Sequence, residues 1–236
     1  MPTAPHYLVY PVDWDALSST LSGANLITNQ PCVNDFGECF DISAPTEQLG
    51  IPQVYCPPEY TLEQKVGISS DVWALGCTLF EIRTGRKLFD TFDDDEDEYL
   101  TTMAVILGKF PEPWWSETWA VRRDFLQDET DGNGLVVGVD DRGDVGSGEN
   151  DGGRCVEIQP SEPRSIRDAI ARGLEYTHRN RGLDVVRRSI SAEETDLLAD
   201  LLEKLLRYDP SERISPREVL EHRWFKFKEA AIAAGS

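Results

Sequence analysis

Hydrophobic side chains recur with helical spacing in the stretch that begins at Asp71. This stretch is apolar on nearly all sides up to Gly85, a residue that can end a helix in a left-handed conformation. Ser69 or Ser70 can cap its first turn. A helix without a polar face is usually buried, so the pattern predicts a helix at the centre of a domain.

Two more helices are expected further along the chain. Residues 96–107 follow an acidic run, and acidic groups in a first turn face the positive end of the helix dipole. Gly108 stops this helix, and residues 111–115 are predicted to form a turn. Another helix is predicted at residues 117–126.

The last third of the chain is predicted to be helical. Ser191 and Glu194 have the spacing of a capping box, in which each side chain satisfies a free backbone amide. Ser215 and Glu218 form a second such pattern, with Pro216 at the first helical position. The buried stripe that we expect on the first of these helices consists of Leu197, Leu198, Leu201, Leu202, Leu205 and Leu206.

The remaining segments are assigned to strands and loops. Residues 7–10 are an apolar-aromatic run that predicts a short strand, and residues 25–34 are expected to contain another. Residues 38–56 show little periodicity and indicate a loop. Residues 128–154 are rich in Gly and acidic side chains and lack aromatics, so they cannot bury enough apolar surface to order themselves. We expect a mobile acidic loop there.

A calcium site is the alternative interpretation of part of this loop. Residues 129–140 loosely match an EF-hand loop. However, Glu129 replaces the usual first Asp, and Asp140 lies too early to be the bidentate ligand that closes the loop. The acidic-loop interpretation is therefore preferred.

The amino-acid composition of the chain limits which partners and which cellular location can be expected. The 236 residues carry 23 basic and 43 acidic side chains, a formal net charge of −20. Phosphate repels such a surface, so nucleic acid is not an expected direct partner, whereas basic proteins are. Five cysteines without a Cys-x-x-Cys pair indicate reduced thiols and an intracellular location, in the cytoplasm, the nucleus or both. No membrane association is expected, because no apolar run approaches the roughly 20 residues that span a bilayer.

Four short motifs indicate a possible function. They are Asp35-Phe36-Gly37, Tyr55-Cys56-Pro57-Pro58-Glu59, the segment from Ser70 to Cys77, and the segment from Tyr208 to Arg213. In their order and spacing they resemble the protein kinase family, although a single Asp-Phe-Gly would be weak evidence. The Gly-rich loop, strand Lys and His-Arg-Asp loop that should precede them do not occur in the chain.

The resemblance implies ATP and Mg²⁺ as cofactors. Asp35 would hold the metal ion, and Asp35, Phe36 and Gly37 would form part of the nucleotide site. The catalytic Asp of the family has no counterpart, so the chain contains no catalytic residue of its own. We expect no phosphoryl transfer by residues 1–236 alone.

The resemblance also implies structural roles for three residues. Glu59 would form a buried ion pair with Arg213, and Asp71 would hold the catalytic loop in place. The simpler role for Asp71 is that of a carboxylate at the start of a helix, and both roles can hold at once. Cys56 stands where the family usually has an Arg.

Other segments narrow the resemblance within the kinases. Leu88-Phe89-Asp90, residues 106–109 and the insert that follows resemble the group of cyclin-dependent, mitogen-activated and SR-protein kinases. Residues 70–95 and the Trp114-Trp115 turn are most similar to its fungal SR-protein-kinase-like branch.

The narrower resemblance implies a docking site. In SR-protein kinases an acidic groove beside the insert binds Arg-Ser-rich segments, and Glu96, Asp97 and Glu98 fall at the corresponding place. The alternative is a solvated helix start that binds no ligand.

The predicted fold is mainly α: the C-terminal lobe of a protein kinase, with a few short strands near the N-terminus and no N-terminal lobe. Residues 1–236 are then a partial kinase domain. Residues 1–34 are an insert with a strand, and residues 35–59 are the activation segment. The predicted function is that of a serine/threonine kinase acting on Arg-Ser-rich basic proteins, with its missing lobe encoded upstream. The alternative is a catalytically dead module that binds the same proteins.

Overall fold

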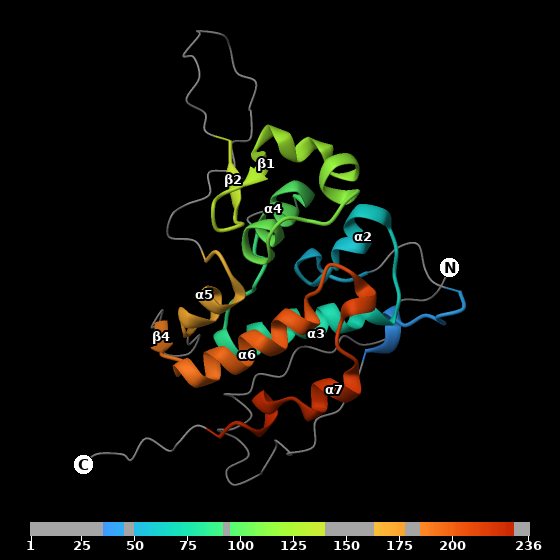
Figure 1. The fold of residues 1–236 in the computed structure, drawn as a ribbon. Helices are drawn as coiled ribbons and strands as arrows, with labels where there is room; N and C mark the ends of the chain where they lie inside the picture. Colours follow the sequence, from blue (N-terminus) through green and yellow to red (C-terminus); the bar gives the residue numbers. More distant parts are fainter. Residues whose placement is uncertain (1–34, 45–49, 92–94, 140–162, 178–184, 229–236) are drawn as a thin grey trace, which may run out of the picture. The chain divides into compact units, whose positions relative to one another are not determined.

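The computed structural model describes residues 35–44, 50–91, 95–139, 163–177 and 185–228 (Figure 1). Residues 1–37 and 38–236 are separate compact units, and packing is described within the second. The strands predicted at residues 7–10 and 25–34 lie outside the described residues, as do residues 140–154 of the predicted loop.

The central helix α3 spans Ile68–Thr84 and starts earlier than predicted. Gly67 is its N-cap, and the Ser70 hydroxyl accepts a hydrogen bond of 3.1 Å from the Gly67 amide. Gly85 ends the helix as predicted, with a left-handed φ of 73°.

Burial of α3 is one-sided. Val72, Trp73, Cys77 and Phe80 are buried on one side. A second face, however, exposes 63% of Ile68, 36% of Leu75 and 73% of Ile82, three residues spaced by seven. The prediction of burial on nearly all sides is therefore wrong for this face, because apolar composition alone cannot say which neighbours are present.

Helix α6, Ala192–Leu205, packs alongside α3 (Figure 1). Its predicted leucine stripe is buried except for Leu197, which is half-buried. Gly76 of α3 permits the close approach, since a Cβ there would lie 2.8 Å from Leu206 Cδ2. The leucine periodicity and this small residue together set the contact between the two helices.

The predicted capping box at the start of α6 is half formed. The Ser191 hydroxyl accepts from the Glu194 amide at 3.2 Å. The Glu194 carboxylate instead accepts two hydrogen bonds from Arg83 of α3, at 2.5 and 2.6 Å. An ion pair between the helices has replaced a local cap.

This ion pair predicts an acid-dependent contribution to stability. The hydrogen bond and charge of Arg83 lower the pKa of Glu194, so its contribution is present above the unfolded pKa of about 4.3 and is lost as pH falls through the lower folded value. We expect Glu194→Gln to cost about 1.5–3 kcal/mol at pH 7 and less below pH ~4. Urea unfolding at several pH values measures this. The exposed neighbour Glu193→Gln is the control, and equal effects of the two variants at every pH would contradict the assignment.

Helix α4, Glu96–Leu107, has the predicted bounds, with Gly108 as its C-cap. The cap at its start is Asp95, whose Oδ1 accepts from the amides of Asp97 and Glu98 at 2.9 and 3.0 Å.

The prediction of a helix at residues 117–126 is wrong. A π-helical turn at Trp114–Thr118 and a 3-10 turn at Ala120–Asp124 lead into strand β1, Leu126–Thr130. Strand β1 pairs antiparallel with β2, Val136–Gly138, so the start of the predicted loop is an ordered hairpin. The aromatic rings here form one cluster that overrides local propensity: Phe110, Trp114, Trp115, Trp119 and Phe125.

The tip of this hairpin is a turn closed by Asp131, and Asp140 of the alternative calcium site lies outside the described residues. Asp131 Oδ1 accepts hydrogen bonds from the amides of Asn133 and Leu135, at 2.8 and 2.9 Å. The carboxylate therefore closes a turn. No group of three or more potential metal ligands occurs among the described residues.

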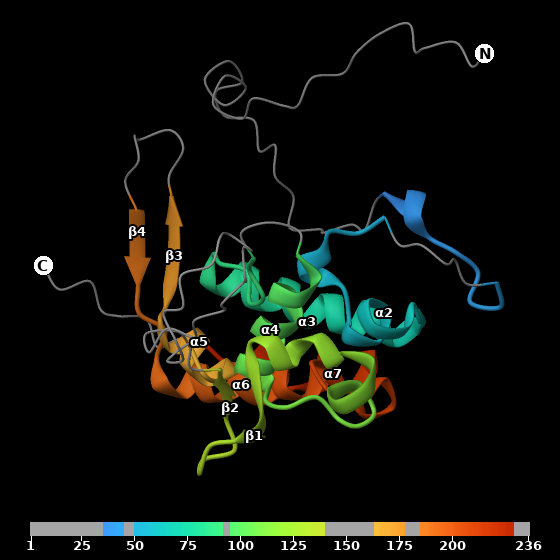
Figure 2. The same ribbon diagram turned by 90° about the horizontal axis from the view of Figure 1, so that it is seen from above.

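A short helix and a second hairpin precede α6. Helix α5 spans Ile166–Ala171, and strand β3, Leu174–Thr177, pairs antiparallel with β4, Val185–Arg188 (Figure 2). A Cβ on Gly85 would lie 2.1 Å from the Glu175 carbonyl oxygen, so this glycine lets β3 sit against the end of α3. All four described strands lie within residues 126–188, a region for which the sequence predicted no strand.

The C-terminal part ends in α7, Pro216–Glu221, where the predicted capping box of Ser215 and Glu218 is complete. A 3-10 turn at Arg223–Lys226 follows. None of the helices in the described ranges is long and apolar enough to cross a membrane.

Candidate functional site

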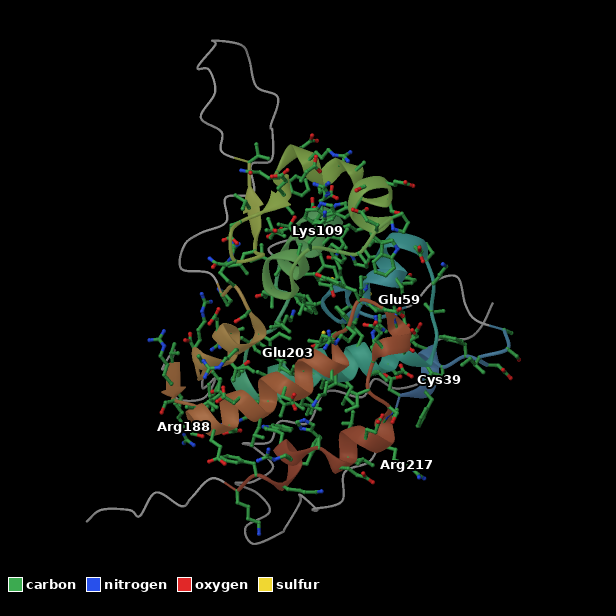
Figure 3. All side chains as sticks on the ribbon, viewed as in Figure 1. Cys39, Glu59, Lys109, Arg188, Glu203 and Arg217 are labelled. Carbon is green, nitrogen blue, oxygen red and sulfur yellow. The ribbon has the colours of Figure 1, made fainter. Side chains whose placement is uncertain are left out.

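A buried ion pair fixes helix α2, Pro58–Glu63, to the core. Arg213 donates from Nη1 and Nη2 to the two carboxylate oxygens of Glu59, at 2.7 and 2.6 Å, and Figure 3 marks Glu59. Arg213 also donates to the carbonyls of Ser69 and Arg207, at 2.7 and 2.9 Å. One guanidinium thereby joins residues 59–69 to residues 207–213, two regions that are far apart in sequence.

The residues just before α2 are held by two tyrosines. The Tyr55 hydroxyl donates to Glu81 of α3 at 2.5 Å, and the Tyr99 hydroxyl of α4 donates to the Cys56 carbonyl at 2.8 Å. The Glu81 hydrogen bond is the main cause that raises the pKa of Tyr55 to about 12. This phenol therefore stays protonated and keeps its hydrogen bond at neutral pH.

Cys56 is a buried thiol at the position where the kinase resemblance expects a guanidinium. Burial, with a smaller effect of the Glu96 carboxylate, raises its pKa to about 11. A thiol with this pKa is not a nucleophile at neutral pH. Cys39, Cys56 and Cys77 are all free thiols.

Asp35 begins the Asp-Phe-Gly segment with a left-handed φ of 61°, a conformation uncommon for residues other than glycine. Phe36 is 65% exposed, and Phe36–Glu38 form a 3-10 turn. Kinases hold Mg²⁺ with more than one side chain together with nucleotide phosphates. Among the described residues, Asp35 belongs to no group of three or more potential metal ligands. The described residues therefore do not by themselves form a complete nucleotide–metal site.

Asp71 lies in the first turn of α3 and is exposed. It shares the exposed face with Ile68 and Leu75, three and four residues away. Its carboxylate makes no hydrogen bond or ion pair with any described residue. The structure thus brings Asp71 into contact with none of the acidic residues of α4.

The three predicted docking residues have different surroundings. Glu96 is exposed, whereas Asp97 and Glu98 are half-buried. Asp97 Oδ1 accepts a hydrogen bond of 2.8 Å from the Trp119 indole, so this carboxylate secures the aromatic cluster. Glu98 lines a cavity of about 610 Å³. Glu96 and Glu98 are therefore the members of the trio with room for a ligand.

Sequence reasoning missed several of these contacts. Asp95 could have been found, because an Asp directly before a predicted helix is a common N-cap. The pairing of Tyr55 with Glu81 and of Asp97 with Trp119 carries no local signal, since each joins residues 22 or more positions apart.

Comparison with known proteins points to the same family as the four sequence motifs. A family model described as "Protein kinase domain" matches residues 23–225. The dual specificity protein kinase lkh1 of Schizosaccharomyces pombe is 29% identical over 171 residues, which cover 72% of this chain and 20% of that protein. The serine/threonine-protein kinase AFC3 of Arabidopsis thaliana is 28% identical over 172 residues, covering 73% of this chain and 35% of AFC3. The human dual specificity protein kinase CLK2 is 28% identical over 171 residues, with coverages of 72% and 27%.

These relatives are much longer than the matched region, because this chain spans between 20% and 35% of their length. The family model nevertheless covers most of the chain, including the segments fixed by Glu59 and Arg213. The chain belongs to the protein kinase family.

Proposed function

We propose that the chain is the substrate-binding, C-terminal part of a serine/threonine kinase domain that acts on Arg-Ser-rich basic proteins. ATP and Mg²⁺ would be bound mainly by a part of the domain that precedes residue 1, with Asp35 as one metal ligand. The observation that carries this proposal is the Glu59–Arg213 pair, which locks the segment ending in Pro-Pro-Glu onto the helical core. That segment presents the protein substrate in the kinases that the chain resembles.

The acidic start of α4 supports the substrate class. Glu96 and Glu98 are available for a cationic ligand, and the chain carries a net charge of −20. Guanidinium groups bind carboxylates through paired hydrogen bonds. The free thiols at three described positions suit an intracellular protein of the cytoplasm or nucleus. The narrower place in the fungal SR-protein-kinase-like branch rests on the Trp114-Trp115 turn and the insert.

The substrate class is tested by binding of a fluorescent Arg-Ser repeat peptide to the purified chain, measured by anisotropy at several salt concentrations. We expect saturable binding that weakens steeply as salt screens the charges. Glu96→Gln combined with Glu98→Gln is expected to weaken binding roughly fivefold to tenfold.

The matched control neutralises two exposed carboxylates elsewhere, Glu117→Gln and Glu221→Gln. Asp97 stays unchanged, because its loss would disturb Trp119 as well. Equal affinities of the docking and control variants would contradict the assignment of the site.

A second candidate function is a catalytically dead docking module. It is favoured because Asp35 belongs to no group of three or more potential metal ligands among the described residues, whereas Glu96 and Glu98 lie on an ordered helix. Both candidates predict peptide binding, and they differ in whether the native protein transfers phosphate.

A further inference from the structure

The last described segment of the chain carries more positive than negative charge. Residues 217–228 hold four cationic side chains and two acidic ones, a local balance of +2 with His222 counted as neutral, whereas the whole chain has a formal net charge of −20. All four cationic residues are exposed, and they are Arg217, Arg223, Lys226 and Lys228. The segment therefore differs in charge from the rest of the molecule.

These four cationic groups have no counterion within the part of the chain that the structure describes. Arg83, Arg122 and Arg213, by contrast, are each paired with a carboxylate. No hydrogen bond or ion pair joins the four side chains to a described residue. Their acidic neighbour Glu218 is engaged locally, because it accepts from the Ser215 hydroxyl at 2.6 Å in the capping box. Four positive charges are thus open to an anionic partner.

Two large apolar side chains are exposed among these cations. Leu220 is 74% and Phe225 45% exposed. Leu220 lies three positions after Arg217 on α7, a spacing that places the two on one side of the helix. Phe225 directly precedes Lys226 in the turn that follows. A partner that covers these side chains would remove apolar area from water, which favours association.

The segment is fixed to the core from its inner side. Val219 is buried, and Trp224 packs against the hydrophobic core. The His222 ring joins the turn to α6, since its Nδ1 accepts from the Trp224 amide at 3.3 Å and its Nε2 lies 2.8 Å from Asp200 Oδ2. Figure 1 shows α7 and the turn beside α6, and Figure 3 marks Arg217. A surface on a fixed backbone loses less conformational entropy when it binds.

We propose that this segment binds a partner protein through an acidic stretch that also contains apolar side chains. The binding surface, called here the C-terminal basic surface, consists of Arg217, Leu220, Arg223, Phe225, Lys226 and Lys228. Its cations pair with carboxylates of the partner, and each guanidinium can hold a carboxylate through two hydrogen bonds. Leu220 and Phe225 contact the apolar side chains. The surface has the opposite charge to Glu96 and Glu98, so the inference goes beyond the proposed function and does not depend on it.

Net charge favours a short acidic protein segment over larger anionic ligands. A bilayer or a nucleic acid extends far beyond the screening length, which is roughly 8 Å at 0.15 M salt. Such a ligand would also meet the acidic remainder of a chain of charge −20. A short peptide segment can contact the C-terminal basic surface alone, and charge complementarity therefore points to it.

The test measures binding of a fluorescent peptide of Asp-Glu-Leu repeats to the purified chain, by anisotropy at about 0.15 M salt. We expect saturable binding that weakens as salt is raised. Arg223→Gln combined with Lys226→Gln is expected to weaken binding about tenfold, and Leu220→Ser about threefold. A peptide of Asp-Glu-Ser repeats has the same charge without the apolar side chains, so Leu220→Ser should not weaken its binding.

Matched variants separate this surface from general effects of charge and stability. Arg188→Gln with Arg207→Gln removes the same charge from two exposed positions elsewhere. Ile82→Ser replaces an apolar side chain that is 73% exposed, close to the value for Leu220. Neither control is expected to weaken binding more than about twofold. Far-ultraviolet circular dichroism checks that each variant is folded.

Three results would overturn the inference. The first is the absence of saturable binding, or equal losses in the surface and control variants. The second is tighter binding of phosphatidylserine vesicles or of single-stranded RNA than of the acidic peptide. The third is salt-sensitive self-association, measured by sedimentation, that Arg223→Gln with Lys226→Gln abolishes, because the occupant is then a second copy of the chain.

The proposed function is tested separately by the acidic residues of α4. Glu96→Gln with Glu98→Gln is expected to leave binding of the acidic peptide unweakened, although it weakens binding of the Arg-Ser peptide. Arg223→Gln with Lys226→Gln should not weaken binding of the Arg-Ser peptide. Failure of one peptide to bind therefore overturns one of the two proposals and leaves the other standing.

Discussion

Arg213→Ala is expected to lower the free energy of unfolding by about 3–5 kcal/mol, because it leaves the Glu59 carboxylate buried and unpaired. Glu59 is 5% and Arg213 8% exposed. The substitution also removes the hydrogen bonds to the Ser69 and Arg207 carbonyls. Urea unfolding followed by tryptophan fluorescence measures the change.

Two comparisons make this result specific. Arg217→Ala removes an exposed guanidinium a few residues away and is expected to change stability by no more than about 0.5 kcal/mol. Replacing the pair together, as Glu59→Leu with Arg213→Met, is expected to recover part of the loss, since an apolar pair leaves no buried charge. A cost below about 1 kcal/mol for Arg213→Ala would show that the pair does not secure α2.

Trp73→Ala is also expected to lower the free energy of unfolding by about 3–5 kcal/mol, because it leaves a cavity at the centre of the core. Trp73 is fully buried and stacks on Phe89, with ring centroids 5.7 Å apart. The Arg213 guanidinium lies 5.1 Å from its ring centroid, a cation–π distance. Part of the stability lost in Trp73→Ala is therefore the contact of the indole ring with Arg213 of the ion pair.

The control for Trp73 lies on the same helix. Ile82→Ala removes an apolar side chain that is 73% exposed and is expected to cost no more than about 0.5 kcal/mol. Because Trp73 and Arg213 are in contact, the double variant Trp73→Ala with Arg213→Ala should cost less than the sum of the two. Strict additivity would contradict the coupling, and equal costs for Trp73→Ala and Ile82→Ala would contradict the burial.

Elements with strong local signals were predicted well. Helix α4 has the predicted bounds because an acidic first turn and Gly108 mark both of its ends. The Ser215 capping box formed because its partners are three residues apart and compete with nothing else. The predicted pairing of Glu59 and Arg213 relied on family resemblance, since no local pattern joins residues 154 positions apart.

The predictions that failed did so for one reason: contacts between residues far apart in sequence decide the structure at these positions. Residues 117–126 have helical propensity, but packing of Trp119 and Phe125 produces turns and a strand instead. Asp97 was indistinguishable from Glu96 and Glu98 in sequence, yet it bonds Trp119. The basic residues that line the same cavity as Glu98 follow the C-terminal ends of α3 and α5, so the mixed charge of the cavity lining appears only in the folded structure.

The central claim is that this chain is the substrate-binding part of an active kinase. Sequencing the native transcript as one full-length molecule tests it most directly. We predict that the reading frame continues upstream of Met1 into a Gly-rich loop, a strand Lys and a His-Arg-Asp loop. An in-frame stop codon directly before Met1, with none of these segments encoded, would contradict the claim and favour the docking module.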